Sequence, residues 1–152
     1  MLLVASLAAA PALGAEKDLA DLGRWAAGTW RCQARAGDAA YTFSLAFAWD
    51  LDKKWLVARL DGRARKGKER VRSLNVYGWD GDKLTSTFVN NQGARGTATS
   101  PGWDGDRLVF TGTVDIDRFH TTSTTTLVRR GKRELALSAR TGGFAAETTC
   151  KK

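Results

Sequence analysis

Apolar and polar residues alternate along most of the chain after Gly28, which is typical of β-strands with one buried face. In the segment 41–49 the odd positions are aromatic or aliphatic and the even positions are small or polar. Nine turn signals interrupt this alternation at nearly even spacing: Gly37-Asp38, Leu51-Asp52, Lys66-Gly67, Asp80-Gly81, Gln92-Gly93, Asp104-Gly105, Ile116-Asp117, Arg130-Gly131 and Gly142-Gly143. They predict about ten strands joined as consecutive hairpins.

One helix is predicted before the strands. Leu19, Leu22 and Ala26 recur at helical spacing within residues 16–27, and acidic residues occupy the first turn of that segment. No linker or second domain is apparent. The fold class is therefore all-β, with a short N-terminal helix and an antiparallel up-and-down barrel of about ten strands.

A five-residue motif of the form W-D-x-D-[KR] occurs at 49–53, 79–83 and 103–107. Asp-Gly favours a two-residue hairpin loop whose central residues both take positive φ, so we interpret the three copies as turns. A calcium loop is the alternative, but calcium takes six or more oxygens and the motif supplies too few beside a cation. We expect no metal site.

The order of the turns assigns them to the two ends of the sheet, because consecutive hairpins turn at alternate ends. The three W-D-x-D turns and the turn 129–133 share one end, where Trp25, Trp30, Trp49, Trp79 and Trp103 gather. We interpret these tryptophans as the packing of a closed barrel end, and a stacking platform for sugars or bases is the alternative. The hairpin 63–72, with six basic residues, lies at the opposite end.

The first fifteen residues are uncharged and end in small residues after Pro11, as in a secretory signal peptide. We expect cleavage after Ala15, a mature domain over 16–152, and export to the periplasm or the exterior. In such a compartment Cys32 and Cys150 are expected to form a disulfide, which requires the first and last strands to be neighbours. The net charge of +8 favours anionic partners, among which export argues against nucleic acid. No later run is long enough to span a membrane.

The motif Gly28-Thr29-Trp30, which follows the predicted helix and opens the first strand, resembles the G-x-W signature of the lipocalin and fatty-acid-binding (calycin) superfamily. The whole mature chain also looks like a group of exported bacterial lipocalin-like domains. The resemblance implies an antiparallel barrel whose cavity binds small apolar or amphiphilic molecules. It also implies a basic residue late in the chain that packs over the tryptophan, for which Arg140 and Lys151 are the candidates.

Strand alternation gives the candidate ligand site. Because Phe119 and Leu127 share odd parity, Thr121, Ser123 and Thr125 are expected to face inward, as are Asn75 and Tyr77. The predicted ligand-binding residues inside the barrel are Phe43, Phe47, Tyr77, Phe88, Phe110, Thr121 and Ser123. Arg65 and Lys68 are expected at the rim, where they would meet an anionic headgroup or surface.

Catalysis is not expected. His120 is the only histidine, and pairing of the cysteines leaves no free thiol, so the usual nucleophile–base pairs are missing. His120 falls on the outward face, which argues against an axial haem ligand, and we expect no cofactor. Two classes of function remain: a small-molecule carrier with an open cavity, and a structural or interaction module of the cell envelope with a filled core.

Overall fold

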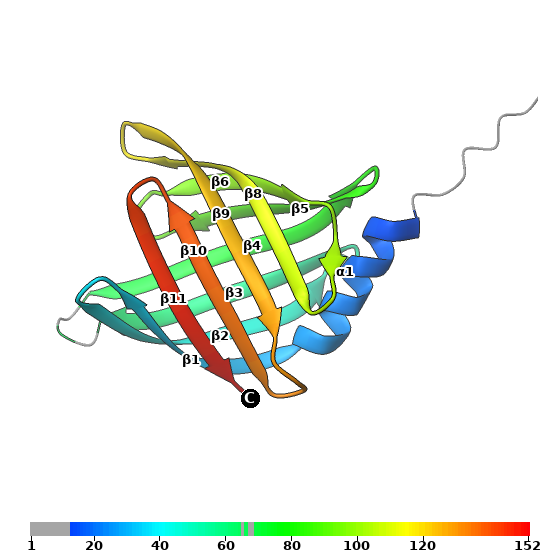
Figure 1. The fold of residues 1–152 in the computed structure, drawn as a ribbon, viewed down its shortest axis with the longest axis horizontal. Helices are drawn as coiled ribbons and strands as arrows, with labels where there is room; N and C mark the ends of the chain where they lie inside the picture. Colours follow the sequence, from blue (N-terminus) through cyan, green and yellow to red (C-terminus); the bar gives the residue numbers. More distant parts are fainter. Residues whose placement is uncertain (1–12, 65, 67–68) are drawn as a thin grey trace, which may run out of the picture.

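The structure, a computed structural model, describes residues 13–64, 66 and 69–152. One helix precedes eleven strands (Figure 1). The elements are α1 (Leu13–Ala26), β1 (Gly28–Ala36), β2 (Ala39–Asp50), β3 (Trp55–Ala64), β4 (Arg70–Asp80), β5 (Lys83–Asn90), β6 (Arg95–Ser100), β7 (Trp103–Asp104), β8 (Arg107–Ile116), β9 (Phe119–Arg129), β10 (Glu134–Thr141) and β11 (Phe144–Lys151). Of the predicted signal peptide, residues 1–12 lie outside the described residues, and Leu13–Ala15 belong to α1.

All strand pairs are antiparallel, and ten strands form a closed ring. Successive strands pair in chain order from β1 to β6; β6 then pairs with β8, and β11 pairs back with β1. The two-residue strand β7 pairs only with β8. The predicted up-and-down barrel is therefore confirmed, except that the connection after β6 carries this extra small hairpin.

The disulfide is confirmed at the closure of the ring. Cys32 of β1 and Cys150 of β11 are direct cross-strand partners, their Cα atoms are 4.0 Å apart, and their sulfur atoms are bonded. Residues 118 positions apart in the sequence meet here because the last strand pairs with the first.

Several hairpin loops differ in one detail from the expected turn. In the loops after Ala36, Asp80, Asp104 and Thr141, the two loop residues are a glycine followed by Asp or Gly, and only that first glycine has positive φ. This is the arrangement of a type II′ turn. The aspartate of each Asp-Gly pair therefore ends its strand, and the expectation of positive φ at both central residues was wrong.

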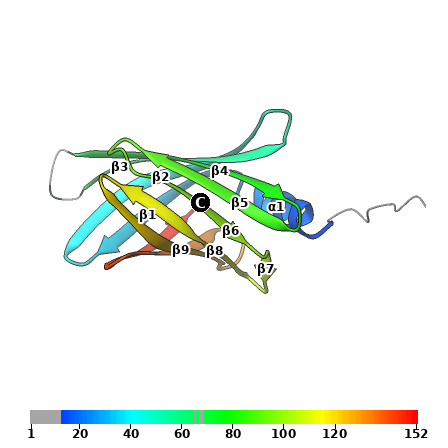
Figure 2. The same cartoon turned by 90° about the horizontal axis from the view of Figure 1, so that it is seen from above.

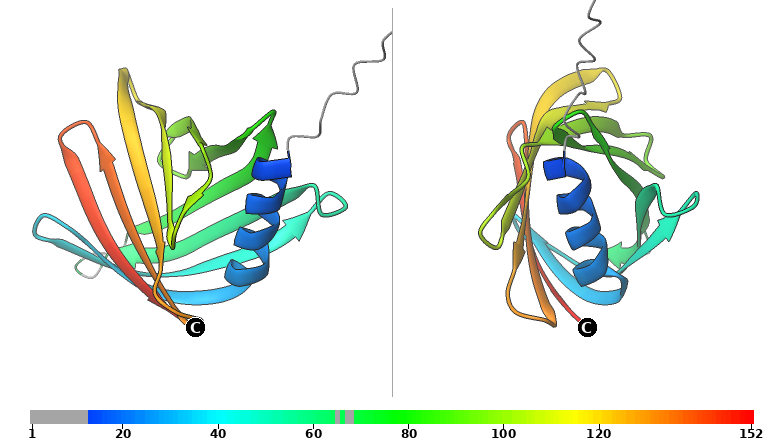
Figure 3. Two further views of the ribbon diagram at one scale, coloured as in Figure 1. Left: turned by 45° about the vertical axis from the view of Figure 1, so that its right-hand side comes forward. Right: turned by 90° about the vertical axis from the view of Figure 1, so that its right-hand side faces the viewer.

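Helix α1 lies across one end of the barrel (Figure 3). Asp18 accepts a hydrogen bond from the Trp103 backbone N–H (3.2 Å), and the Trp25 indole donates to the Gly131 carbonyl (3.1 Å). On the same helix, Asp21 pairs with Arg129 at 2.7 Å. These contacts place α1 against turns that the sequence assigned to one end. Gly23 of α1 also lies so close to Trp49 that a Cβ atom at this position would overlap the indole ring. That assignment is confirmed, and we call this end the helix-closed end.

The tryptophans at the helix-closed end pack as a cluster. The Trp25 ring lies 5.4 Å from Trp30 and 6.4 Å from Trp103, and the Arg129 guanidinium lies 3.8 Å from the Trp103 ring centre. The basic residue over Trp30 is Lys152, with Nζ 4.6 Å from the ring centre, so neither Arg140 nor Lys151 takes that place. Lys152 Nζ also donates hydrogen bonds to the carbonyls of Trp25 and Ala27.

Candidate functional site

The barrel interior has two layers of different character. Near α1, the inward positions carry leucines that are at most 1% exposed: Leu56, Leu84, Leu108, Leu127 and Leu135. Leu19 and Leu22 of α1 pack into the same cluster, together with Trp30. Above this packed layer lies a row of three aromatic rings, in which the ring centre of Tyr77 is 6.4 Å from that of Phe47 and 5.5 Å from that of Phe110. These three rings form an aromatic floor.

The other half of the lumen is a cavity of about 390 Å³ that begins at this floor. Its lining continues to Ile116 and Phe144, beside the β8–β9 and β10–β11 turns. These turns lie at the end of the barrel opposite α1, together with the β1–β2, β3–β4 and β5–β6 turns (Figure 2), and we call it the open end. Its apolar lining includes Phe43, Leu45, Phe47, Leu60, Tyr77, Phe88, Phe110, Val114, Leu137 and Phe144. The volume falls within the range of about 300–1,000 Å³ that is usual for small-molecule sites.

Polar groups line the cavity beside the aromatic rings. They are uncharged hydroxyls and amides: Ser73, Asn75, Ser86, Asn90, Thr97, Thr113, Ser123, Thr125, Thr141 and Thr148. Two of the hydroxyls, on Ser123 and Thr141, hydrogen-bond to each other at 3.0 Å. None of the described residues that line the cavity carries a charge.

Tyr77 lies at the boundary between the packed layer and the cavity. Its side chain is 6% exposed, and burial raises the pKa of its phenol to about 12. Because the low-dielectric surroundings disfavour the phenolate, the hydroxyl stays neutral at physiological pH and remains a hydrogen-bond donor and acceptor.

Most of the predicted site residues line this one cavity. Phe43, Phe47, Tyr77, Phe88, Phe110 and Ser123 are all among them. Thr121 has the expected inward parity, but it packs beside Gly142 near the rim and does not line the cavity. Arg65 and Lys68 lie outside the described residues.

Sequence reasoning found Phe88 on β5 but missed Ser86 on the same strand, and it missed the contributions of β10 and β11, among them Leu137 and Thr148. The alternation in those strands is weak, because Ala, Ser and Thr occupy both faces. The signal that would have found these residues is register: once β11 pairs with β1, the inward position of Cys150 fixes Thr148 and then Ala146 as inward.

The described cations of the hairpin 63–72 do not enter the cavity. These cations, Arg63, Lys66, Arg70 and Arg72, are exposed and do not line it. Arg70 forms an ion pair with Asp61, and its hydrogen bonds hold the pKa of the Asp61 carboxyl below its usual value.

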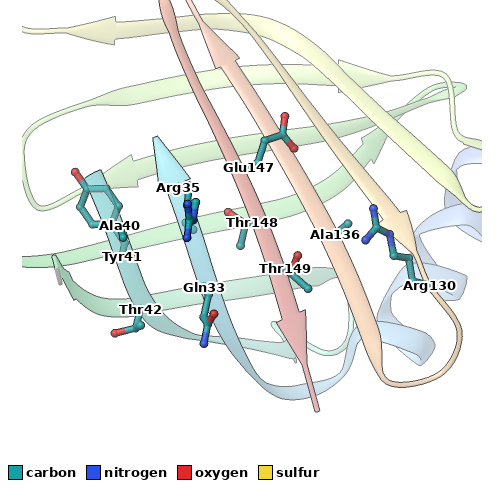
Figure 4. Close-up of a pocket in the computed structure, with 11 residues that line it drawn as sticks. Gln33, Arg35, Ala40, Tyr41, Thr42, Arg130, Ala136, Glu147, Thr148 and Thr149 are labelled. Atoms are coloured by element: carbon teal, nitrogen blue, oxygen red, sulfur yellow. The ribbon is translucent and has the colours of Figure 1, made fainter. Parts of the chain in front are cut away.

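A second hollow, of about 570 Å³, lies on the outer face of β1, β2, β10 and β11 (Figure 4). The residues Gln33, Arg35, Thr42, Glu147 and Thr149 that border it are all exposed. The hollow is larger than the lumen cavity, but it is an open surface depression with charges of both signs. We therefore place the candidate site in the lumen.

Two further features bear on chemistry. The His120 Nδ1 atom lies 2.6 Å from an Asp115 carboxylate oxygen, and both side chains are on the surface. Within the described part of the chain, no group of three or more His, Cys, Asp or Glu residues could hold a metal ion. The described residues likewise include no helix with the length and apolar character needed to cross a membrane.

Comparison with solved structures identifies other barrels of this architecture. A de novo designed fluorescence-activating β-barrel matches with a TM-score of 0.54 and 13% identity, over 87% of this chain and 97% of the design. A redesigned β-barrel, mFAP1, bound to DFHBI, also matches at 0.54, with 10% identity over 86% of this chain and 97% of its own. Neither the protein-family models nor the curated proteins compared with the sequence match it.

At such low identities the likeness shows the fold alone. The chain is a closed antiparallel ten-strand barrel with one N-terminal helix, the lipocalin-like architecture that the G-x-W motif implied. Descent from the lipocalin superfamily and a bacterial origin remain predictions.

Proposed function

We propose that this protein is an exported carrier that binds one small amphiphilic molecule inside the barrel. The observation that supports it most directly is the division of the lumen. A cavity of about 390 Å³ begins at the aromatic floor, while the leucines of the layer beneath are at most 1% exposed. A barrel that served only as a structural module would gain stability by filling this half with large apolar side chains, as leucines fill the other half.

The polar lining supports an amphiphile over a plain hydrocarbon. Hydroxyls and amides such as Asn75, Ser123 and Thr125 would leave hydrogen-bonding groups unsatisfied against an entirely apolar ligand. We infer a ligand whose apolar part stacks on Phe47, Tyr77 and Phe110 and whose uncharged polar groups bond to this wall. In its structure the designed barrel mFAP1 is bound to DFHBI, which supports the idea that a barrel of this fold can hold a ligand.

The predicted preference for an anionic headgroup has less support. No described cation lines the cavity, so a carboxylate inside it would lose hydration without a charged partner. The contact of an anionic headgroup with Arg65 and Lys68 stays a prediction from the sequence. An ion pair in contact with solvent contributes only about 0–1 kcal/mol.

The test is a fluorescence titration with a dansyl-labelled fatty acid and with the matching dansyl-labelled fatty alcohol. Two variants on the same strand provide a matched pair. Ala139→Phe places a ring in the lumen, whereas Ala136→Phe places the same ring in the outer-face hollow. We expect saturable binding to wild type and to Ala136→Phe, and at least about a tenfold loss of affinity in Ala139→Phe, because about two buried methylenes are displaced.

Absence of saturable binding to wild type would overturn the carrier function and leave the interaction module. A loss of ligand affinity in Ala136→Phe but not in Ala139→Phe would show that the ligand binds in the outer-face hollow. The alcohol is expected to bind at least as tightly as the acid, because the uncharged lining offers a carboxylate no charged partner. A strong preference for the acid would instead support the predicted contact with Arg65 and Lys68.

A further inference from the structure

The open end carries large apolar side chains that are exposed to solvent. Phe119 is 75% exposed, Phe144 is 55% exposed and Ile116 is 41% exposed. They come from two hairpins, β8–β9 and β10–β11, which are adjacent because β9 pairs with β10. Large exposed apolar groups gathered at one place mark a surface that contacts a partner or a membrane.

These side chains stand at the end of the barrel where the cavity opens. Ile116 and Phe144 line the cavity as well as the rim, so apolar surface is continuous from the lumen to the outside. The β8–β9 hairpin, which carries Phe119, reaches beyond the neighbouring β10–β11 hairpin (Figure 3). An approaching apolar phase would therefore meet Phe119 first and then the mouth of the cavity.

The charges around these rings favour a negatively charged surface. Arg118 lies in the turn between Ile116 and Phe119, and Arg140 lies one residue before the end of β10; both are exposed, and neither forms an ion pair among the described residues. The carboxylate of Asp115 is already engaged by Arg95 and His120. Asp117 in the same turn is the opposing charge.

We propose that the rim formed by Ile116, Phe119 and Phe144 docks on the surface of a lipid bilayer that contains anionic lipid. The two phenylalanine rings enter the boundary between headgroups and acyl chains, while Arg118 and Arg140 lie at the level of the phosphates. The cavity then opens directly onto the acyl region, and a ligand would enter without crossing water. The proposal of docking depends only on the residues of the rim, whereas the entry of ligand rests on the proposed carrier function.

The experiment is co-sedimentation of the purified protein with phosphatidylcholine vesicles, with and without phosphatidylglycerol. We expect Phe119→Ser with Phe144→Ser to lower the partition coefficient about tenfold or more, because both inserted rings are lost. Leu51→Ser is the control: it removes a 69% exposed leucine at the helix-closed end and should bind as wild type does. Arg118→Gln with Arg140→Gln should weaken binding only to the vesicles that contain phosphatidylglycerol, by about fivefold for each arginine.

Two results would overturn the proposal: no binding of wild type to either vesicle, or wild-type binding by the double phenylalanine variant. Sedimentation velocity of the same proteins without lipid tests whether the rim instead binds a second copy of this chain. A wild-type dimer that the phenylalanine variant loses, together with no vesicle binding, would assign the rim to self-association. Titration of the dansyl ligand in buffer keeps the two proposals apart, because it reads the lumen without any membrane.

Discussion

The two halves of the barrel are built from the same ten strands but differ in how their interiors are filled. At the helix-closed end the inward leucines and Trp30 have almost no exposure, four further tryptophans are partly buried against them, and helix α1 fills the opening. At the open end phenylalanines and aliphatic side chains alternate with serines, threonines and asparagines around the cavity. The comparison indicates that stability is concentrated in one half, which leaves the other half free to present a cavity.

The difference follows from what covers each end. Helix α1 brings Leu19, Leu22 and Trp25 to one mouth and anchors itself through Asp18 and Asp21. No described element covers the other mouth, so its inner positions can stay polar and hydrated. Three predictions test this division of the barrel, beginning with the largest expected effect.

The disulfide should make the largest contribution to stability. Replacing both Cys32 and Cys150 with Ala removes a cross-link between residues 118 positions apart. Such a cross-link lowers the entropy of the unfolded chain and thereby stabilises the folded protein by about 4–5 kcal/mol. We expect the free energy of unfolding, measured in urea by tryptophan fluorescence, to fall by about that amount. Reduced wild type is the control and should unfold with the variant. A loss below about 1 kcal/mol would mean that closure of the ring does not depend on this bond.

Equivalent Leu→Ala changes in the two halves should have unequal effects. Leu127 is 1% exposed in the packed layer, whereas Leu60 borders the cavity and is partly buried. We expect Leu127→Ala to lower the free energy of unfolding by about 3 kcal/mol and Leu60→Ala by about 1 kcal/mol, because only the first opens a new void. Affinity for the dansyl ligand should change only in Leu60→Ala. Equal losses of stability would contradict the division into a packed and an open half.

The burial of Tyr77 at the boundary should make a smaller, pH-dependent contribution to the free energy of unfolding. Burial raises the pKa of the Tyr77 phenol to about 12, while an unfolded tyrosine titrates near about 10. Between these values the unfolded chain releases the proton first, so the free energy of unfolding falls as pH rises, by about 2–3 kcal/mol in total, and is unaffected below about pH 10.

Tyr77→Phe is the test of that effect. Urea unfolding of wild type and variant should differ in pH dependence only above about pH 10, where the variant lacks this part of the decline. Tyr41 and the lysines are common to both proteins and cancel in the difference. The same slope in both proteins would mean that the Tyr77 hydroxyl is hydrated in the native state, which would contradict its burial at the floor of the cavity.

Much of the fold follows from the sequence alone. Alternation and turn spacing predicted ten ring strands, and the order of the turns put Trp49, Trp79 and Trp103 at one end. The expected pairing of Cys32 with Cys150 already required the ring to close. These inferences succeeded because strand parity and hairpin order are local properties, repeated along the chain until they fix the whole ring.

The tertiary structure decided what local pattern could not. Thr121, Ser123 and Thr125 share one parity, yet only Ser123 and Thr125 line the cavity, because distance from the rim depends on the register of neighbouring strands. Lys152 over Trp30 likewise depends on where the chain end meets α1. Alternation determines which face a side chain takes, but only the packing of α1 into one end determined how much of the interior is filled and how much remains a cavity.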